Sequence, residues 1–98
     1  MPKVIFSIRY EILPEKREAY LDVIRELKAL VMADGLESYS VFETKSKKNC
    51  FEEHYTFSDK DAYEDFDDNP NERVNILMTK LSDMIKQQTT EYTTLFEI

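Results

Sequence analysis

The stretch LESYSVFETKSKKNCFEEHYTF, residues 36–57, decides which fold this chain can adopt. Its two ends, residues 36–45 and 49–57, are rich in β-branched and aromatic side chains, which is typical of strands. The polar segment SKKN between them is typical of a turn. The pattern therefore predicts a β-hairpin in the middle of the chain, and the fold depends on what precedes and follows it.

Residues 3–13, KVIFSIRYEIL, alternate between two faces and predict a strand. One face is apolar and needs a cover: Val4, Phe6, Ile8, Tyr10 and Ile12. The other face is mixed: Ile5, Ser7, Arg9, Glu11 and Leu13. Residues 14–35 have apolar side chains at helical spacing and predict a helix, with Pro14 in its first turn and Gly35 as a left-handed C-terminal cap.

After the hairpin, SDKDAYEDF at 58–66 predicts a short helix capped by Ser58. A further helix follows, with Asn69 as its cap and Pro70 at its first helical position. Residues 89–98, TTEYTTLFEI, predict a last strand. The order β-α-β-β-α-β, with the second helical region broken in two, indicates an α+β ferredoxin-like fold in one domain, 1–98. We expect a four-stranded antiparallel sheet with helices on one face.

Composition excludes several classes of function. Asp and Glu outnumber Lys and Arg by 20 to 13, giving a formal charge of −7, whereas nucleic acids and anionic membranes bind basic faces. One cysteine allows neither an intrachain disulfide nor a cysteine cluster for zinc. The N-terminal residues lack the apolar run of a signal peptide, and no segment approaches the ~20 apolar residues of a membrane span. We expect a soluble cytoplasmic protein.

Three pieces of the chain, in this order and spacing, resemble the antibiotic biosynthesis monooxygenase family of dimeric α/β-barrel proteins. They are VIFSIRYEI leading into a long helix, DGLESYSVFE, and FEEHYTFSDKDAYEDFDDNPNERV. The resemblance covers nearly the whole chain. It implies a homodimer in which two sheets face each other, with a small-molecule pocket between the sheet and helices of each subunit. Some members of the family are cofactor-free monooxygenases of phenolic or quinol-like compounds, and others bind and degrade haem.

The chain departs from the family pattern at three positions. Phe57 stands where many members have Trp, Phe66 where a His is frequent, and Asn71 where a His often follows the Pro. Haem binding in the family's mode needs a His on the last helix, and this sequence has none after His54. We therefore expect no cofactor. The resemblance is still compatible with an oxidoreductase that acts on a small aromatic substrate. In a cofactor-free monooxygenase the phenolate of the substrate itself can react with oxygen, so no cofactor is needed.

The resemblance places the pocket residues between sheet and helices. Tyr55 and Asn71 are the predicted catalytic residues. The predicted ligand-binding residues are Ile8, Tyr10, Tyr39, Phe57, Tyr63, Phe66 and Asn75. The alternative is that these aromatic side chains simply fill the core, which would leave a non-enzymatic dimeric module that binds a ligand or a partner. An open cavity lined by Tyr or Asn would favour the enzyme.

His54, the only histidine, should lie on the other face of its strand. If Phe51, Tyr55 and Phe57 contact the helices, alternation turns Glu52 and His54 toward the partner subunit. Glu52 and His54 could serve as ligands or acid–base groups, but two ligands make a poor metal site and we expect no metal. The other interpretation is a hydrogen-bonded interface histidine. Arg9 is expected to pair with a carboxylate such as Glu52 across the barrel.

Overall fold

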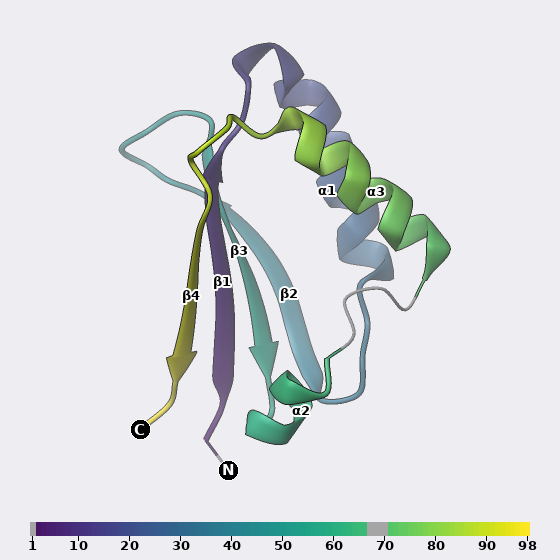
Figure 1. Ribbon diagram of the computed structural model, residues 1–98, viewed down its shortest axis with the longest axis vertical. Helices are drawn as coiled ribbons and strands as arrows, with labels where there is room; N and C mark the ends of the chain where they lie inside the picture. Colours follow the sequence, from purple (N-terminus) through teal and green to yellow (C-terminus); the bar gives the residue numbers. More distant parts are fainter. Residues whose placement is uncertain (1, 67–70) are drawn as a thin grey trace.

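A four-stranded antiparallel sheet carries helices on one of its faces in the computed structural model, which describes residues 2–66 and 71–98 (Figure 1). The strands lie in the order β2-β3-β1-β4. The elements are β1 (Val4–Glu11), a 3-10 turn (Pro14–Lys16), α1 (Arg17–Leu30), β2 (Leu36–Glu43), β3 (Cys50–Phe57), α2 (Lys60–Glu64), α3 (Glu72–Met84) and β4 (Glu91–Phe96). The predicted ferredoxin-like α+β fold is confirmed.

Strict alternation along β3 separates the two faces of the sheet. Its odd-numbered residues, Phe51, Glu53, Tyr55 and Phe57, are buried under the helices, while those between them are half-buried. The core combines this face with the apolar stripes of α1 and α3. The fully buried side chains in it include Tyr10, Ile12, Tyr20, Leu27, Phe57 and Leu77. The sheet therefore has one face packed on helices and one face open.

Gly35 has the predicted left-handed conformation, with φ of 80°, but the predicted reason is wrong. The helix α1 ends at Leu30 with Val31 in an extended conformation as its C-cap, so Gly35 lies beyond the helix, in the turn that leads into β2. A Cβ at Gly35 would collide with the side chain of Ala62 on α2. The glycine is thus required both by its φ and by the close approach of α2.

The beginnings of α2 and α3 also differ from the prediction. Asp59, rather than Ser58, caps α2, because its side chain accepts a hydrogen bond from the backbone N–H of Ala62 at 2.8 Å. Helix α3 begins at Glu72, two residues later than predicted, and its cap is Asn71. The predicted cap Asn69 and the following Pro70 lie outside the described residues. At each helix start, two nearby polar residues are both able to act as the N-cap, and the local sequence pattern does not show which of them does.

The open face of the sheet carries polar side chains that are satisfied within the chain. Arg9 and Glu52 lie opposite each other on β1 and β3, with Arg9 Nε 3.7 Å from Glu52 Oε2. Glu52 Oε1 lies 2.8 Å from His54 Nε2 and accepts a hydrogen bond from Ser7 Oγ at 3.0 Å. Arg9 thus pairs on the neighbouring strand, whereas we had expected a pair across the barrel. Within 2–66 and 71–98, no three potential metal ligands cluster.

No helix in the described part of the chain combines the length and the apolar character needed to cross a bilayer.

Candidate functional site

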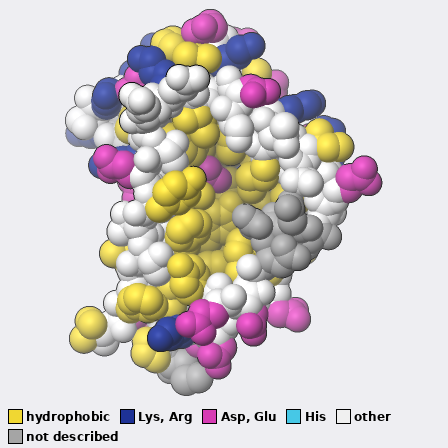
Figure 2. Space-filling model, viewed as in Figure 1, with side chains coloured by type: hydrophobic (Ala, Val, Ile, Leu, Met, Phe, Trp, Pro, Cys, Tyr) yellow, Lys and Arg dark blue, Asp and Glu magenta, His cyan; other side chains and the backbone are white. Residues whose placement is uncertain are grey.

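A cavity of about 860 Å³ lies between the sheet and α3 and opens to the surface. Figure 2 shows it as a hollow whose walls are hydrophobic side chains. The side chains that line it come from β1, β3, α2, the residues just after α2, α3, β4 and the segment between α3 and β4. They are Phe6, Ile8, Tyr10, Glu53, Tyr55, Tyr63, Glu64, Phe66, Asn75, Met78, Leu81, Ser82, Ile85, Lys86, Gln87, Gln88, Thr90 and Tyr92. The core is therefore not filled at this place.

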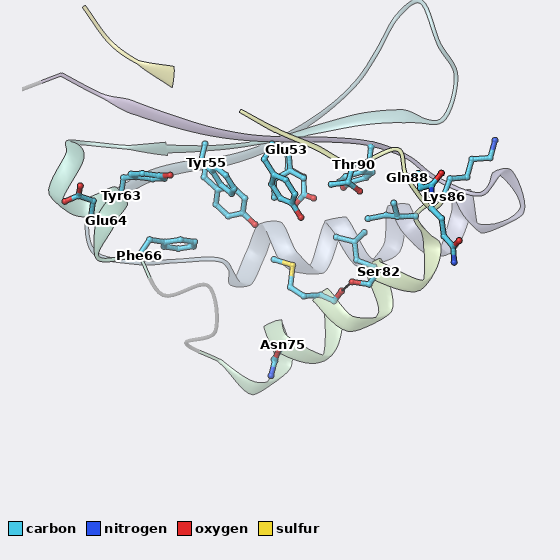
Figure 3. Close-up of a pocket in the computed structure, with 18 residues that line it drawn as sticks. Glu53, Tyr55, Tyr63, Glu64, Phe66, Asn75, Ser82, Lys86, Gln88 and Thr90 are labelled. Atoms are coloured by element: carbon cyan, nitrogen blue, oxygen red, sulfur yellow. Dashed lines mark hydrogen bonds between the residues drawn. The ribbon is translucent and has the colours of Figure 1, made fainter. Parts of the chain in front are cut away.

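Six of the residues predicted for the pocket line this cavity: Ile8, Tyr10, Tyr55, Tyr63, Phe66 and Asn75. Tyr55 points from β3 into the cavity, whereas Asn75 lies at its edge with the amide directed away from it (Figure 3). Three predicted residues, Tyr39, Phe57 and Asn71, are not part of the lining. Tyr39 and Phe57 are buried behind it, and Phe57 packs edge-on against Tyr63 and Phe66.

Asn71 has a structural task on the surface. Its Oδ1 accepts hydrogen bonds from the backbone N–H groups of Arg73 at 2.7 Å and Val74 at 3.2 Å. These bonds cap α3, whose first N–H groups otherwise have no partner within the helix. The side chain is exposed, and its predicted catalytic role receives no support from its position.

One wall of the cavity is a continuous cluster of aromatic rings. Phe6 lies 6.0 Å from Tyr55 and 6.2 Å from Tyr63, measured between ring centroids. It stacks on Tyr92 of β4, with an angle of 12° between the planes. Tyr55 in turn contacts Phe66 at 5.5 Å. The strand pattern turns Phe6, Tyr55 and Tyr92 to the same side of the sheet, and Tyr63 of α2 and Phe66 after it complete this aromatic wall.

Glu53 is the acidic residue that the sequence interpretation missed. It lies on β3 between Phe51 and Tyr55, on the face covered by helices, and only 2% of its surface is exposed. It belongs to the cavity lining, where Figure 3 shows it at the centre of the sheet side. The signal was available, because the alternation that buries Phe51, Tyr55 and Phe57 also buries residue 53.

Tyrosine hydroxyl groups surround the Glu53 carboxyl. The hydroxyl of Tyr39 donates to Glu53 Oε1 at 2.6 Å. Tyr10, which lies beside Glu53, shares a hydrogen bond of 2.7 Å with Tyr20. Burial raises the pKa of Glu53, and the hydroxyl groups of Tyr39 and Tyr10 oppose that rise by hydrogen bonding to the ionised form. Burial, reinforced by the charge of Glu53, also raises the pKa of Tyr10 and of Tyr39, so both phenols stay neutral hydrogen-bond donors.

The rim of the cavity is polar. Glu64 lies at the α2 end, and Lys86, Gln88 and Thr90 lie at the opposite end (Figure 3). Lys86 Nζ is 2.7 Å from Glu11 Oε2, so its charge is already paired. The cavity thus combines an apolar aromatic wall, one buried carboxyl group and a polar mouth. This arrangement can hold a small molecule through apolar contacts with the wall and hydrogen bonds at the carboxyl group and the mouth.

No model of a known protein family matches this sequence, and no curated protein matches it. Several solved structures, however, match its fold at low sequence identity. A conserved protein from Methanosarcina mazei Go1 superposes with a TM-score of 0.78 at 14% identity, covering 97% of this chain and 92% of that chain. A mutant of SnoaB, a cofactor-independent oxygenase from Streptomyces nogalater, gives 0.70 at 17% identity, covering 95% and 90%. A protein described as an antibiotic biosynthesis monooxygenase gives 0.69 at 21% identity, covering 100% and 97%. The chain shares their ferredoxin-like fold.

Proposed function

We propose that this protein is a cofactor-independent monooxygenase that acts on a small aromatic substrate of phenol or quinol type. The observation that carries the proposal is the open cavity with an aromatic wall and a buried carboxyl group. Two structures of similar fold are described as a cofactor-independent oxygenase and an antibiotic biosynthesis monooxygenase, which supports the same reaction class.

The size and the chemistry of the cavity support an aromatic substrate. Its volume of about 860 Å³ lies within the range of ~300–1,000 Å³ that small-molecule sites occupy. The rings of Phe6, Tyr55 and Tyr92 offer flat surfaces on which a planar ligand can stack. We propose that Tyr55 contacts the substrate directly, because it lines the cavity and points into it (Figure 3).

The test is oxygen consumption with a panel of naphthols, quinols and hydroxylated anthrones, with mass spectrometry of the products. We expect at least one compound to gain an oxygen atom without an added cofactor. Ile8→Trp, which fills the cavity from β1, should abolish binding and turnover together. A panel with neither binding nor oxygen uptake in the wild type would overturn the proposal.

A second candidate is a module that binds a small aromatic ligand and does not turn it over. It is favoured by one observation: of the two residues predicted to be catalytic, Tyr55 lines the cavity and Asn71 caps a helix on the surface. Saturable binding of naphthols without oxygen uptake, unchanged by the presence or absence of oxygen, would select this function.

We also propose a homodimer formed through the open face of the sheet, as the family resemblance implies. Phe42 and Leu95 belong to this face, since they pair with Glu52 and Ile5, and they are 54% and 51% exposed. A domain of this length has a thin core, and covering these side chains would extend it. Sedimentation equilibrium measures the association, and a monomer at all concentrations would refute it.

A further inference from the structure

We propose that Glu53 is the acid–base group of the cavity and that it recognises its ligand through a hydroxyl hydrogen on an aromatic or enolic ring. The inference deepens the proposed function and rests on it for the identity of the pocket. The step is a proton transfer. The ligand O–H bond breaks, its electron pair stays on the ligand oxygen, and the proton binds the Glu53 carboxylate. Tyr39 and Tyr10 act as positioning residues.

The first argument is geometric. Glu53 is the acidic side chain of the cavity that lies deep in it, whereas Glu64 stands at the rim (Figure 3). A ligand that lies against the ring of Tyr55 lies next to Glu53, because the two side chains are neighbours on the same face of β3. A hydroxyl group on such a ligand is therefore within reach of the carboxyl group.

The second argument concerns hydrogen-bonding capacity. A carboxylate has about four lone-pair sites, and the Tyr39 hydroxyl uses one of them on Oε1. The Tyr10 hydroxyl, which shares a hydrogen bond with Tyr20, lies beside the carboxyl group on the β1 side. Capacity for a ligand O–H donor therefore remains. An ether or a hydrocarbon of the same shape offers nothing to the ionised carboxylate.

The third argument is electrostatic. Among the residues that the structure describes, no basic side chain forms an ion pair with Glu53, and Lys86 at the cavity mouth is bound to Glu11 instead. A buried carboxylate without a cation is costly, and a hydroxyl donor from the ligand would lower this cost. A carboxyl group with a raised pKa is also closer in proton affinity to a phenol, which makes it the better base for one.

The groups that face Glu53 from each neighbouring element set the expected pH dependence. They are Tyr10 on β1, Tyr20 on α1, Tyr39 on β2 and Tyr55 on β3, while Glu64 of α2 and the ion-paired Lys86 lie at the two ends of the rim. The side chains that α3 places on the lining are uncharged: Asn75, Met78, Leu81 and Ser82. Glu53 is therefore the carboxyl group deep in the cavity whose ionisation a ligand against Tyr55 would meet, and Glu64 lies apart from it at the rim.

The experiment compares the affinities of naphthol and its methyl ether across a pH series. In the wild type, naphthol should bind more tightly as pH rises through the pKa of Glu53, and more weakly again where naphthol itself ionises. The methyl ether should show no such rise. Glu53→Gln keeps the shape and removes the charge, so the preference for naphthol should fall about tenfold and the rise should disappear.

The matched control is Glu52→Gln, the same chemical change on the opposite face of β3, which should keep both the preference and the pH profile. Tyr39→Phe removes a donor to the ionised form of Glu53, so the midpoint of the affinity rise should move to higher pH. If Glu53 only supported the fold and did not meet the ligand, the loss of the Tyr39 hydroxyl would leave the midpoint of ligand affinity unchanged. If Glu53→Gln does not fold, the shift in Tyr39→Phe decides the question.

The outcomes separate this inference from the proposed function. Naphthol preference retained in Glu53→Gln, or an unmoved midpoint in Tyr39→Phe, would overturn the role of Glu53 even if the wild type consumes oxygen. Binding that depends on Glu53, without oxygen uptake for any compound, would overturn the monooxygenase and leave the role of Glu53 intact.

Discussion

Replacement of Gly35 by alanine should destabilise the fold through two separate effects. The first is conformational, because Gly35 has φ of 80°, and an L-residue in the left-handed region costs about 1–2 kcal/mol. The second is steric. The added Cβ would lie well inside the 3.0 Å at which real Cβ contacts end, against the Cβ of Ala62, and 3.3 Å from Ser58 Oγ. Overpacking of this kind costs about 1–3 kcal/mol.

The two effects together amount to about 2–5 kcal/mol, a large part of the ~5–15 kcal/mol that stabilises a typical domain. Urea denaturation followed by circular dichroism measures the loss, and the melting temperature should fall by about 10 °C or more. The clash also acts on α2, which carries Tyr63 and Glu64 into the cavity, so ligand affinity should fall as well.

A double-mutant cycle separates the two effects. Ala62→Gly alone should cost about 1 kcal/mol, because glycine is a poor helix residue. In Gly35→Ala/Ala62→Gly the clash is gone and the conformational cost remains, so the double variant should be about 1–3 kcal/mol more stable than additivity predicts. A loss below about 1 kcal/mol in Gly35→Ala, or strictly additive losses, would refute the close approach of α2 to this turn.

Three further predictions concern the cap of α3, the open face of the sheet and the ion pairs of Glu11 on β1. Asn71→Ala should lose about 1 kcal/mol of stability, because the helix loses its cap, and naphthol affinity should stay unchanged. Unchanged stability with a loss of naphthol affinity would instead support the predicted catalytic role of Asn71. Phe42→Asp should weaken the proposed dimer in sedimentation equilibrium, and an unaltered association constant would place the interface elsewhere. Lys47 and Lys86 lower the pKa of Glu11 to about 2, so this carboxylate stabilises the fold above its ordinary pKa and loses that effect as pH falls toward 2. The stability difference between wild type and Glu11→Gln should therefore shrink over this range, and a constant difference would contradict the pairing.

Sequence alone predicted the order of elements and the inward face of the sheet, because strand alternation is local. The same alternation placed residue 53 inside, yet a charged side chain is rarely buried, and Glu53 was left out of the predicted site. The far end of the cavity could not be predicted from local pattern. Residues 86–90 have no periodicity, and their path depends on tertiary hydrogen bonds, from Leu13 N–H to the Met84 carbonyl and from Lys86 N–H to the Glu11 carbonyl.

Two costly features coincide in this structure, and the coincidence argues for a site. A cavity beside the core forfeits packing contacts between side chains, and the buried Glu53 carboxylate, which pairs with no basic side chain among the described residues, forfeits hydration. Either feature could arise from imperfect packing alone, but Glu53 lines that very cavity. On the open face, by contrast, Glu52 is surrounded by Arg9, His54 and Ser7 and stays half-buried, so its charge is satisfied where it stands. Departures from good packing and good charge pairing are expected where function demands them. Here both departures lie in one cavity, between the sheet and α3.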